Sequence, residues 1–352
     1  MGTMNNGNTM FFEMELAGEP PLERETAERL FSVARDLLPR RFWEWMTEEK
    51  LLALGDEKEE LLYLHATGTL GGFISLTAYR GPKGLAFFNK VRRQEYKWAG
   101  ELLAEQDFLR LRYAWRRDLR PADLKMLRTL GLPKGTSDLV PEFSSARPGF
   151  HDWHLNNDEG LVLAKALEIF DGFLDETEGV DPALIWPSVE TCPWLRFGTD
   201  GLVRAVQIPL EAGVEEAGWA PPTGWPQPGL KRRGTWEIGC FHPISPVGKP
   251  KERKSITQVS VVVDGENGMA LHHSMGLAGE PHLKTLWTTM AEAVENLGHL
   301  PSRLRVKDEA SEAMFRALGF DVERSTEMPA FDEMQETMLG MMGDTRLDAL
   351  SI

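Results

Sequence analysis

The sequence of 352 residues is poor in cysteine and has no long apolar run and no excess of positive charge. Its two cysteines cannot make a disulfide framework, which indicates a reducing, cytoplasmic compartment. No apolar stretch approaches the ~20 residues of a membrane-spanning helix, and residues 1–10 lack the basic and apolar regions of a secretory signal. A net charge of −15 argues against a general binder of polyanions. These absences predict a cytoplasmic protein that does not contact membranes.

The composition that is present, 42% hydrophobic and 26% charged, is that of a globular protein. At about 150 residues per domain the length predicts two compact units. A stretch rich in proline, glycine and tryptophan over 211–234 marks a boundary, and we expect its Trp219 and Trp225 to pack back onto a domain. The expected organisation is a disordered tail over 1–12, an N-terminal α+β domain over 13–178, a connecting segment over 179–234, a C-terminal mixed-sheet domain over 235–340 and a flexible tail over 341–352.

Apolar spacing predicts the elements of the N-terminal domain. Residues at helical intervals indicate helices over 22–38, 121–130 and 159–173, and strand-like runs occupy 61–65, 73–79 and 108–115. The segment Arg80–Gly84 lacks the GxxxxGK[ST] spacing of a phosphate-binding loop, so we predict a simple turn there. The prolines and glycines between Pro141 and Leu155 predict an ordered loop.

Positive charge is concentrated between Arg80 and Lys134, where 14 Lys and Arg residues stand against six Asp and Glu residues. The interpretation we favour is that this segment neutralises the acidic stretch between Phe11 and Glu60 within one domain. The alternative is a basic surface for phosphate or nucleic acid, with aromatic side chains available to stack on bases. Its candidate residues are Arg110, Arg112, Arg116 and Arg117, with Trp98, Tyr113 and Trp115 as the aromatic groups.

A series of short motifs resembles the N-terminal domain of an uncharacterised group of bacterial proteins. The motifs are Trp43 with Trp45, the stretch from Tyr79 to Leu85, Pro141 with the stretch from Arg147 to Phe150 and Trp153, and the leucine-rich helix that follows. In that group a second domain of unknown function follows the first, and the resemblance covers about 28–172 and 235–340 here. It implies an intracellular bacterial protein of two domains with no agreed activity, and it transfers no catalytic residues.

The C-terminal half predicts a regular order of elements, β-β-α-β-α-β-α. Strands are expected over 256–263, 269–275, 304–306 and 320–322, and helices over 283–297, 308–319 and 329–338. Such an order predicts a mixed sheet with helices packed on it. The whole protein is therefore expected to be of the α+β class.

This order is similar to that of the ribonuclease H-like superfamily, whose nucleases and integrases set one Asp on the first strand and another after a later strand. Those carboxylates hold two metal ions for phosphodiester cleavage. The resemblance implies that Asp264 and Asp308 bind Mg²⁺ or Mn²⁺, with Asp332 or Glu336 as a third ligand. Two features depart from the pattern: the superfamily has three strands before its first helix, which requires 236–241 to join the sheet, and Asp264 begins a turn.

Each of these carboxylates also has an ordinary structural interpretation. Asp264 suits a hairpin turn, Asp308 suits a helix N-cap, and Asp332 and Glu336 suit a solvated helix face. The remaining candidates for thiol or zinc chemistry form no convergent set and are interpreted as structural: Cys192, Cys240, His151, His154, His242, His272 and His273.

Two functional hypotheses from different classes follow. The first is a non-catalytic intracellular binding or interaction protein with a protein partner and no cofactor. The second is a divalent-metal-dependent phosphodiesterase of ribonuclease H-like type that uses Asp264 and Asp308. Binding of RNA or DNA through 80–134 is a minor third hypothesis. Nothing in the sequence indicates a substrate or an oligomeric state.

Overall fold

A computed structural model describes residues 22–55, 60–130, 139–197, 203–210 and 229–344, together with 219, 221–222, 225 and 346–347. The tail predicted over 1–12, and half of the one predicted over 341–352, lie outside the described residues. Among the described residues, no helix has the length and apolar character needed to cross a membrane. Helices and mixed sheets together confirm the α+β class.

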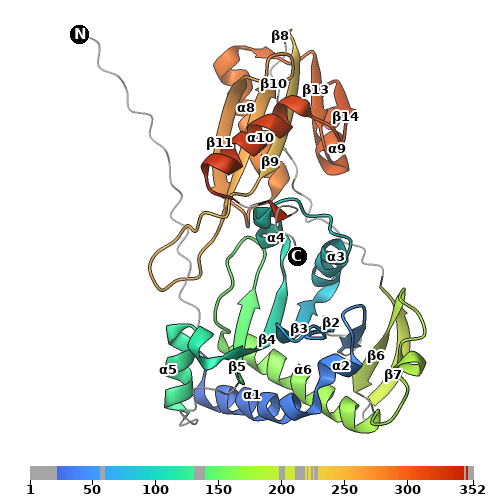
Figure 1. Ribbon diagram of the computed structural model, residues 1–352. Coiled ribbons are helices and arrows are strands. Elements are labelled where there is room, and N and C mark those ends of the chain that lie inside the picture. Colours follow the sequence, from blue (N-terminus) through green and yellow to red (C-terminus); the bar gives the residue numbers. More distant parts are fainter. Residues whose placement is uncertain are drawn as a thin grey trace.

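The N-terminal half is built on a seven-stranded sheet in the order β5-β4-β3-β2-β1-β6-β7 (Figure 1). Neighbouring strands are antiparallel except β1 and β6, which are parallel. The strands are β1 (Leu51–Leu54), β2 (Leu62–Thr67), β3 (Ile74–Arg80), β4 (Phe108–Trp115), β5 (Leu139–Ala146), β6 (Thr191–Phe197) and β7 (Val203–Pro209). Because β6 and β7 extend this sheet, the connecting segment is shorter than the predicted 179–234.

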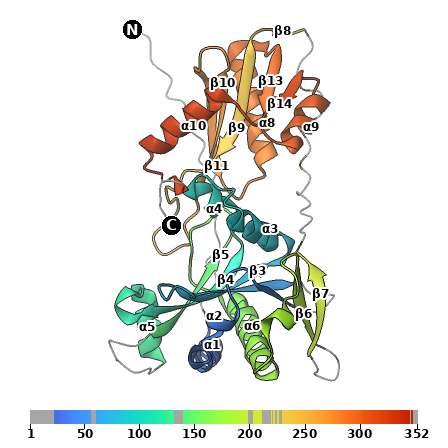
Figure 2. The same ribbon diagram turned by 45° about the vertical axis from the view of Figure 1, so that its right-hand side comes forward.

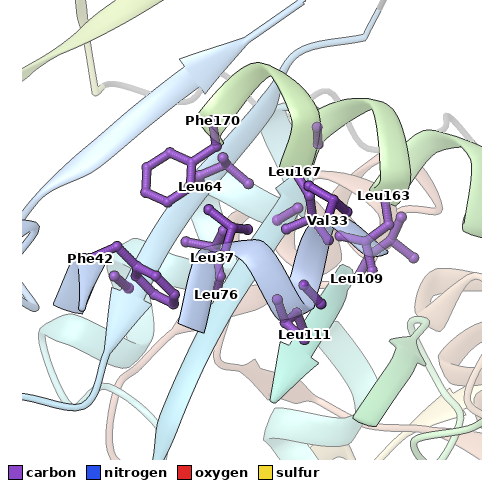
Figure 3. Packing of buried hydrophobic residues seen from close by; sticks show 14 of the residues in the cluster. Val33, Leu37, Phe42, Leu64, Leu76, Leu109, Leu111, Leu163, Leu167 and Phe170 are labelled. Carbon is purple, nitrogen blue, oxygen red and sulfur yellow. The ribbon is translucent and has the colours of Figure 1, made fainter. Parts of the chain in front are cut away.

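Two helices, α1 (Arg24–Leu37) and α6 (Asn157–Glu176), cover one face of this sheet. Figure 3 shows their apolar side chains packed onto the strands, with Phe170 from α6 and Leu37 from α1 close to Leu64 and Leu76. The start of α6 is fixed by Asn156, whose side chain accepts a hydrogen bond from the Glu159 amide while the Glu159 carboxylate accepts one from the Asn156 amide. This core is the main apolar mass of the N-terminal domain.

The opposite face of the sheet carries α3 (Gly81–Arg92) and, beyond it, α4 (Ala99–Glu105). The simple turn predicted at Arg80–Gly84 is therefore wrong, because a helix begins at Gly81. Pro82 suits the first turn of that helix, and Leu85, Phe87 and Phe88 are buried against Tyr79 and Phe108. The ordered loop predicted from Pro141 begins instead as strand β5. Because β5 is an edge strand, a proline can stand in it without removing a hydrogen bond to a neighbouring strand.

The C-terminal half forms a five-stranded sheet in the order β11-β10-β9-β13-β14. Here β9, β10 and β11 are antiparallel neighbours, whereas β13 is parallel to β9 and β14 is parallel to β13. The residues 236–241, left conditional in the sequence analysis, belong to β9. The strands are β9 (Thr235–Phe241), β10 (Thr257–Asp264), β11 (Ala270–Leu277), β13 (Arg303–Val306) and β14 (Val322–Arg324).

Helices cover both faces of this second sheet. On one face lie α8 (His282–Leu297) and α9 (Glu309–Ala317), and on the other α10 (Pro329–Met341) packs on β9 and β10. Trp219 and Trp225 pack on Trp287 of α8, which confirms that these linker tryptophans fold back onto a domain. The remaining short elements are η1 (Leu38–Arg40), α2 (Phe42–Trp45), η2 (Arg116–Asp118), α5 (Pro121–Thr129), α7 (Pro182–Ile185), β8 (Lys231–Arg232) and β12 (His299–Leu300).

The two domains are joined by a loop of the C-terminal domain that inserts into the N-terminal one. Backbone hydrogen bonds run from the His151 amide to the Lys254 carbonyl, at 2.8 Å, and from the Ile256 amide to the Gly149 carbonyl, at 2.9 Å. The buried Arg253 guanidinium donates to the Ser145 carbonyl at 2.9 Å and lies 3.7 Å from the Glu159 carboxylate. This loop therefore places a charged side chain inside the neighbouring domain.

Candidate functional site

A group of side chains that could bind a ligand or take part in a reaction lies where β9 and β13 end. The two strands are parallel, with Glu237 beside Arg305, so continuing their register sets Cys240 level with Asp308. Ligands of α/β sheets bind outside the carboxyl ends of parallel strands. In this protein that edge faces the N-terminal domain: Figures 1 and 2 both show α4 between the two sheets, and Gly100 of α4 contacts the His242 carbonyl. We call Cys240, His242, His282 and Asp308 the carboxyl-edge cluster.

Asp308 is the acidic member of the cluster and is ionised. It caps α9, accepting hydrogen bonds from the Ser311 amide at 2.8 Å and the Ser311 hydroxyl at 2.6 Å. His282, the first residue of α8, places Nε2 at 3.7 Å from Asp308 Oδ1. Burial opposes ionisation, but the interactions with His282 and Ser311 outweigh it and lower the pKa of Asp308 to about 2.

Two other members, Cys240 and His242, are neutral at pH 7. Burial raises the pKa of the Cys240 thiol to about 12, and the nearby Asp308 carboxylate acts in the same direction. Burial also lowers the pKa of His242 to about 4, with a contribution from the charge of His282. Cys240 is consequently a thiol rather than a thiolate, and a thiol is a poor metal ligand and a poor nucleophile.

Neutral hydroxyls and amides extend the cluster beneath α8. Thr285 donates from its hydroxyl to the side-chain oxygen of Gln258 at 3.1 Å, and the hydroxyls of Ser274 and Thr289 are hydrogen-bonded to each other. Gln258 on β10 and Ser274 on β11 share a sheet face with Cys240. The half of this face near the N-terminal domain is therefore polar, while the half beyond it forms the apolar core around Val262 and Leu286.

The structure does not bring Asp264 and Asp308 together. Asp264 pairs with Trp236, which in turn pairs with Leu304, and Asp308 follows Leu304 by four residues. At ~3.3 Å per residue this separates the two positions by about 13 Å along the strands, and they stand at opposite ends of the sheet. Asp264 occupies the expected hairpin turn, where it accepts from the Glu266 amide at 2.9 Å.

The two candidate ligands on the last helix also have partners of their own. Asp332 accepts from Lys307 Nζ at 2.5 Å, and Glu336 accepts from Arg346 at 2.8 Å. Both residues lie on α10, which covers the face of the sheet opposite to α8. Across the part of the chain that the structure describes, no three His, Cys, Asp or Glu side chains are grouped as a metal site.

The four arginines proposed for nucleic acid divide between two places. Arg110 and Arg112 alternate on β4, where Arg110 pairs with Asp152 and Arg112 donates from Nε to Glu142 at 2.6 Å. Arg116 and Arg117 lie in η2, the short helix after that strand. Arg117 pairs with the adjacent Asp118 at 3.6 Å.

Most of the aromatic groups offered for stacking are inside the protein. Trp98 and Tyr113 are buried, and Tyr113 donates its hydroxyl to the Ala34 carbonyl. Trp115 is 44% exposed. The exposed ring near the β4 arginines is instead Phe73, which lies 5.9 Å from the Arg110 guanidinium and 5.6 Å from that of Arg112.

Sequence reasoning found Asp308 but not its neighbours. Cys240 and His242 were set aside because they had no second pair close in sequence, and His282 was not singled out. The signal that could have found them is the strand at 235–241. Cys240 lies at the end of this strand, and His242, two residues later, falls on the same face. Both lie at the carboxyl edge of the sheet, where Asp308 follows the parallel strand β13.

Comparison with known protein families finds two matches. Residues 28–177 match a model described as Domain of unknown function (DUF7309), and residues 227–339 match Domain of unknown function (DUF6930). The chain carries two adjacent domains of unknown function. The two-domain organisation implied by the resemblance is thus confirmed. No curated protein matches the chain.

Proposed function

We propose that the protein is a non-catalytic binding or interaction protein, whose C-terminal domain has a ribonuclease H-like arrangement of strands without a working carboxylate pair. Support for the arrangement comes from the strand order β11-β10-β9-β13-β14, with three antiparallel strands before the first helix of the domain and two parallel strands after it. A cytoplasmic location and a bacterial origin belong to the same proposal, on the cysteine count and the resemblance.

The observation that carries the proposal is that a cysteine, Cys240, and not a carboxylate, lies beside Asp308. In the superfamily, a carboxylate on the first strand and one after a later strand hold the metal pair together. Here β9 is the first strand. Its register with β13, continued three residues past Arg305, sets Cys240 level with Asp308, and the Asp308 charge acts on the Cys240 thiol. Its protonated thiol carries no charge to attract a cation, so Asp308 is left without the second carboxylate that two metals require.

The acidic residue that β9 does contain, Glu237, has its carboxylate bound by other groups. Glu237 is fully buried, accepts from Arg305 at 3.2 Å and accepts from the Phe331 amide of α10 at 2.9 Å. These contacts hold its carboxylate on the face of the sheet that α10 covers. A salt bridge and a helix-end amide occupy the oxygens that a metal would need.

Incubation with single- and double-stranded DNA and RNA in Mg²⁺ or Mn²⁺ tests the proposal. We expect the purified wild-type protein to leave all four substrates intact. Cleavage that depends on the metal and disappears in Asp308→Asn would overturn the non-catalytic proposal. Cleavage that survives both Asp264→Asn and Asp308→Asn would point to a contaminating nuclease, which repurification of the Asp308→Asn protein would remove.

The alternative function is a divalent-metal phosphodiesterase centred on Asp308. The observation that favours it is the low pKa of this carboxylate at the carboxyl edge of two parallel strands. Under this alternative Mg²⁺ or Mn²⁺ would bind Asp308. The nuclease assay above decides between the two, since the alternative requires turnover by the wild-type protein.

A further inference from the structure

The outer edge of β11 is an open strand edge. β11 is the last strand of the five-stranded sheet and pairs with β10 alone, through a register that is regular from His272 to Leu277 and irregular at Leu271. Among the described residues no other strand pairs with it. Figure 1 shows it at the outer margin of the C-terminal sheet. Alternate residues of such a strand direct their backbone N–H and C=O groups away from the sheet.

Apart from the irregularity at Leu271, this edge lacks the devices that protect most strand edges from other chains. Natural edges carry lysine, proline or inward charges, or are covered. The sequence from Ala270 to Leu277 has no proline and no acidic residue, and its only ionisable side chains are His272 and His273. None of its residues is buried, and Met275 is 59% exposed. The irregularity at Leu271 is the one disruption, and it lies near the start of the strand.

One face of β11 is also uncovered. On the other face α8 packs against the strand, and His272 contacts Glu292 at 2.9 Å. His273 and Met275 pair with Val261 and Val259, so they point to the face on which α10 lies. Because α10 packs on β9 and β10, these two side chains remain exposed beside it. A chain added at the edge would therefore find exposed side chains on this face as well as backbone groups.

The surroundings of the edge are acidic. Glu266 is exposed in the turn that precedes β11, and Glu292 and Glu295 are exposed on α8, one turn apart. Near the far end of the strand, Lys284 is paired with Glu280 at 2.9 Å, and the loop before β10 carries Lys249, Lys251 and Lys254. The chain as a whole carries a net charge of −15. A neutral strand with acidic neighbours attracts a basic chain and repels an acidic one, including a second copy of this protein.

We propose that β11 docks an extended, basic segment of a partner protein, which adds a strand to the edge of the C-terminal sheet. This inference rests on the proposed binding function and names its partner class. Backbone hydrogen bonds along His272–Leu277 supply affinity, as in other cases of strand addition, and alternate side chains supply selectivity. Lysine or arginine side chains of the partner meet Glu292 and Glu295, while its apolar side chains lie beside Met275.

The test uses the full-length protein and a defined probe, a fluorescent acetylated peptide that alternates lysine with valine. We expect saturable binding that weakens as salt is raised, together with slower amide hydrogen exchange over His272–Leu277. A control peptide with prolines in place of the central valines should not bind, because proline cannot donate to the ladder.

Matched variants locate the binding site. Met275→Lys places a charge on the exposed edge. It should lower the affinity for the lysine–valine peptide by about tenfold or more, equivalent to about 1.4 kcal/mol. Met341→Lys, at the 82% exposed end of α10, should leave the affinity unchanged. Circular dichroism of both variants checks that they are folded.

Three outcomes would overturn the inference: no binding of the lysine–valine peptide, binding that Met275→Lys leaves unchanged, or a concentration-dependent dimer that Met275→Lys abolishes. The last would assign the edge to a second copy of the chain. None of these outcomes bears on the nuclease assay, so failure of this inference is distinguishable from failure of the proposed function.

Discussion

At the scale of single residues, the carboxyl-edge cluster is defined by what burial does to each group. Burial raises the pKa of the Cys240 thiol and lowers the pKa of His242, leaving both neutral, while hydrogen bonds keep Asp308 ionised against the same effect. Under the proposed function, a single carboxylate beside a protonated thiol recognises a ligand and does not activate water on two metals. The chemistry of the site is thus set by the residue next to Asp308.

The pKa of His242 gives a prediction for stability against pH. Its folded-state pKa, about 4, lies below the ordinary value of 6.5, so the unfolded chain takes up this proton first as pH falls. Stability from this group is complete above pH 6.5 and is lost between about pH 6.5 and 4, by about 3 kcal/mol. We expect His242→Gln to flatten this loss in urea unfolding measured across that range.

His273 provides the matched control for this experiment, because it is an exposed histidine of the same domain. His273→Gln should reproduce the wild-type pH dependence. If His242→Gln and the wild-type protein lose stability equally between pH 6.5 and 4, His242 is not held neutral by burial and this account of the cluster is contradicted.

At the scale of elements, the sequence predicted what apolar periodicity alone determines. Helices α1, α5, α6, α8 and α10 and strands β2, β3, β4, β10 and β11 fall where spacing placed them. The failures have a shared cause: tertiary contacts decided the structure. Gly81–Arg92 is a helix because its apolar side chains fill the gap over Tyr79 and Phe108, and the β6 segment, with Pro193 in its interior, is a strand because β1 and β7 flank it.

The candidate site was only half predictable for the same reason. Asp308 was found because an Asp after a strand and before a helix is a local signal. Its proximity to Cys240 and His282 depends on the register of β9 against β13 and on where α8 begins, which no spacing along the chain reveals. Asp264 was misplaced as a partner of Asp308 because β10 was taken as the first strand of the sheet.

The contact between α4 and the C-terminal domain allows no side chain at Gly100. A Cβ atom there would lie 1.5 Å from the His242 carbonyl oxygen. We therefore expect Gly100→Ala to force α4 away from the carboxyl edge and to lower the free energy of unfolding by about 2 kcal/mol or more. Urea unfolding measures the change.

Gly172, near the C-terminal end of α6, is the control for Gly100. Apart from its chain neighbours and the backbone of its own helix, nothing lies within 4 Å of the position that its Cβ would occupy, so Gly172→Ala should be neutral or stabilising through helix propensity. A Gly100→Ala protein as stable as Gly172→Ala would show that α4 is not held against His242.

At the scale of the whole molecule, the two domains are coupled by buried polar contacts. The Glu159 carboxylate accepts from the Ser145 hydroxyl at 2.5 Å and lies 2.9 Å from Arg147, 3.3 Å from Arg80 and 3.7 Å from Arg253. Burial opposes its ionisation, but the hydrogen bonds from the Ser145 hydroxyl and the Asn156 amide, together with Arg147, hold the pKa of Glu159 below its usual range. Of these partners, Arg253 alone comes from the other domain.

We expect this coupling to make the domains unfold together. Differential scanning calorimetry of the wild-type protein should show one transition. Arg253→Met removes the donors to Ser145 and His154 and should lower the Tm and split the transition, whereas Lys251→Met, on the exposed part of the same loop, should not. Two transitions in the wild-type protein would contradict the coupling.

The central claim, that Cys240 in place of a first-strand carboxylate leaves the C-terminal domain without a metal pair, has a direct test. The measurement is the Tm of the wild-type protein, of Asp308→Asn, of Cys240→Asp and of Cys240→Asp/Asp308→Asn as Mn²⁺ is titrated. The account predicts that Mn²⁺ raises the Tm of Cys240→Asp alone, because that variant sets a second carboxylate beside Asp308. A Tm rise in the wild-type protein that Asp308→Asn abolishes would contradict it.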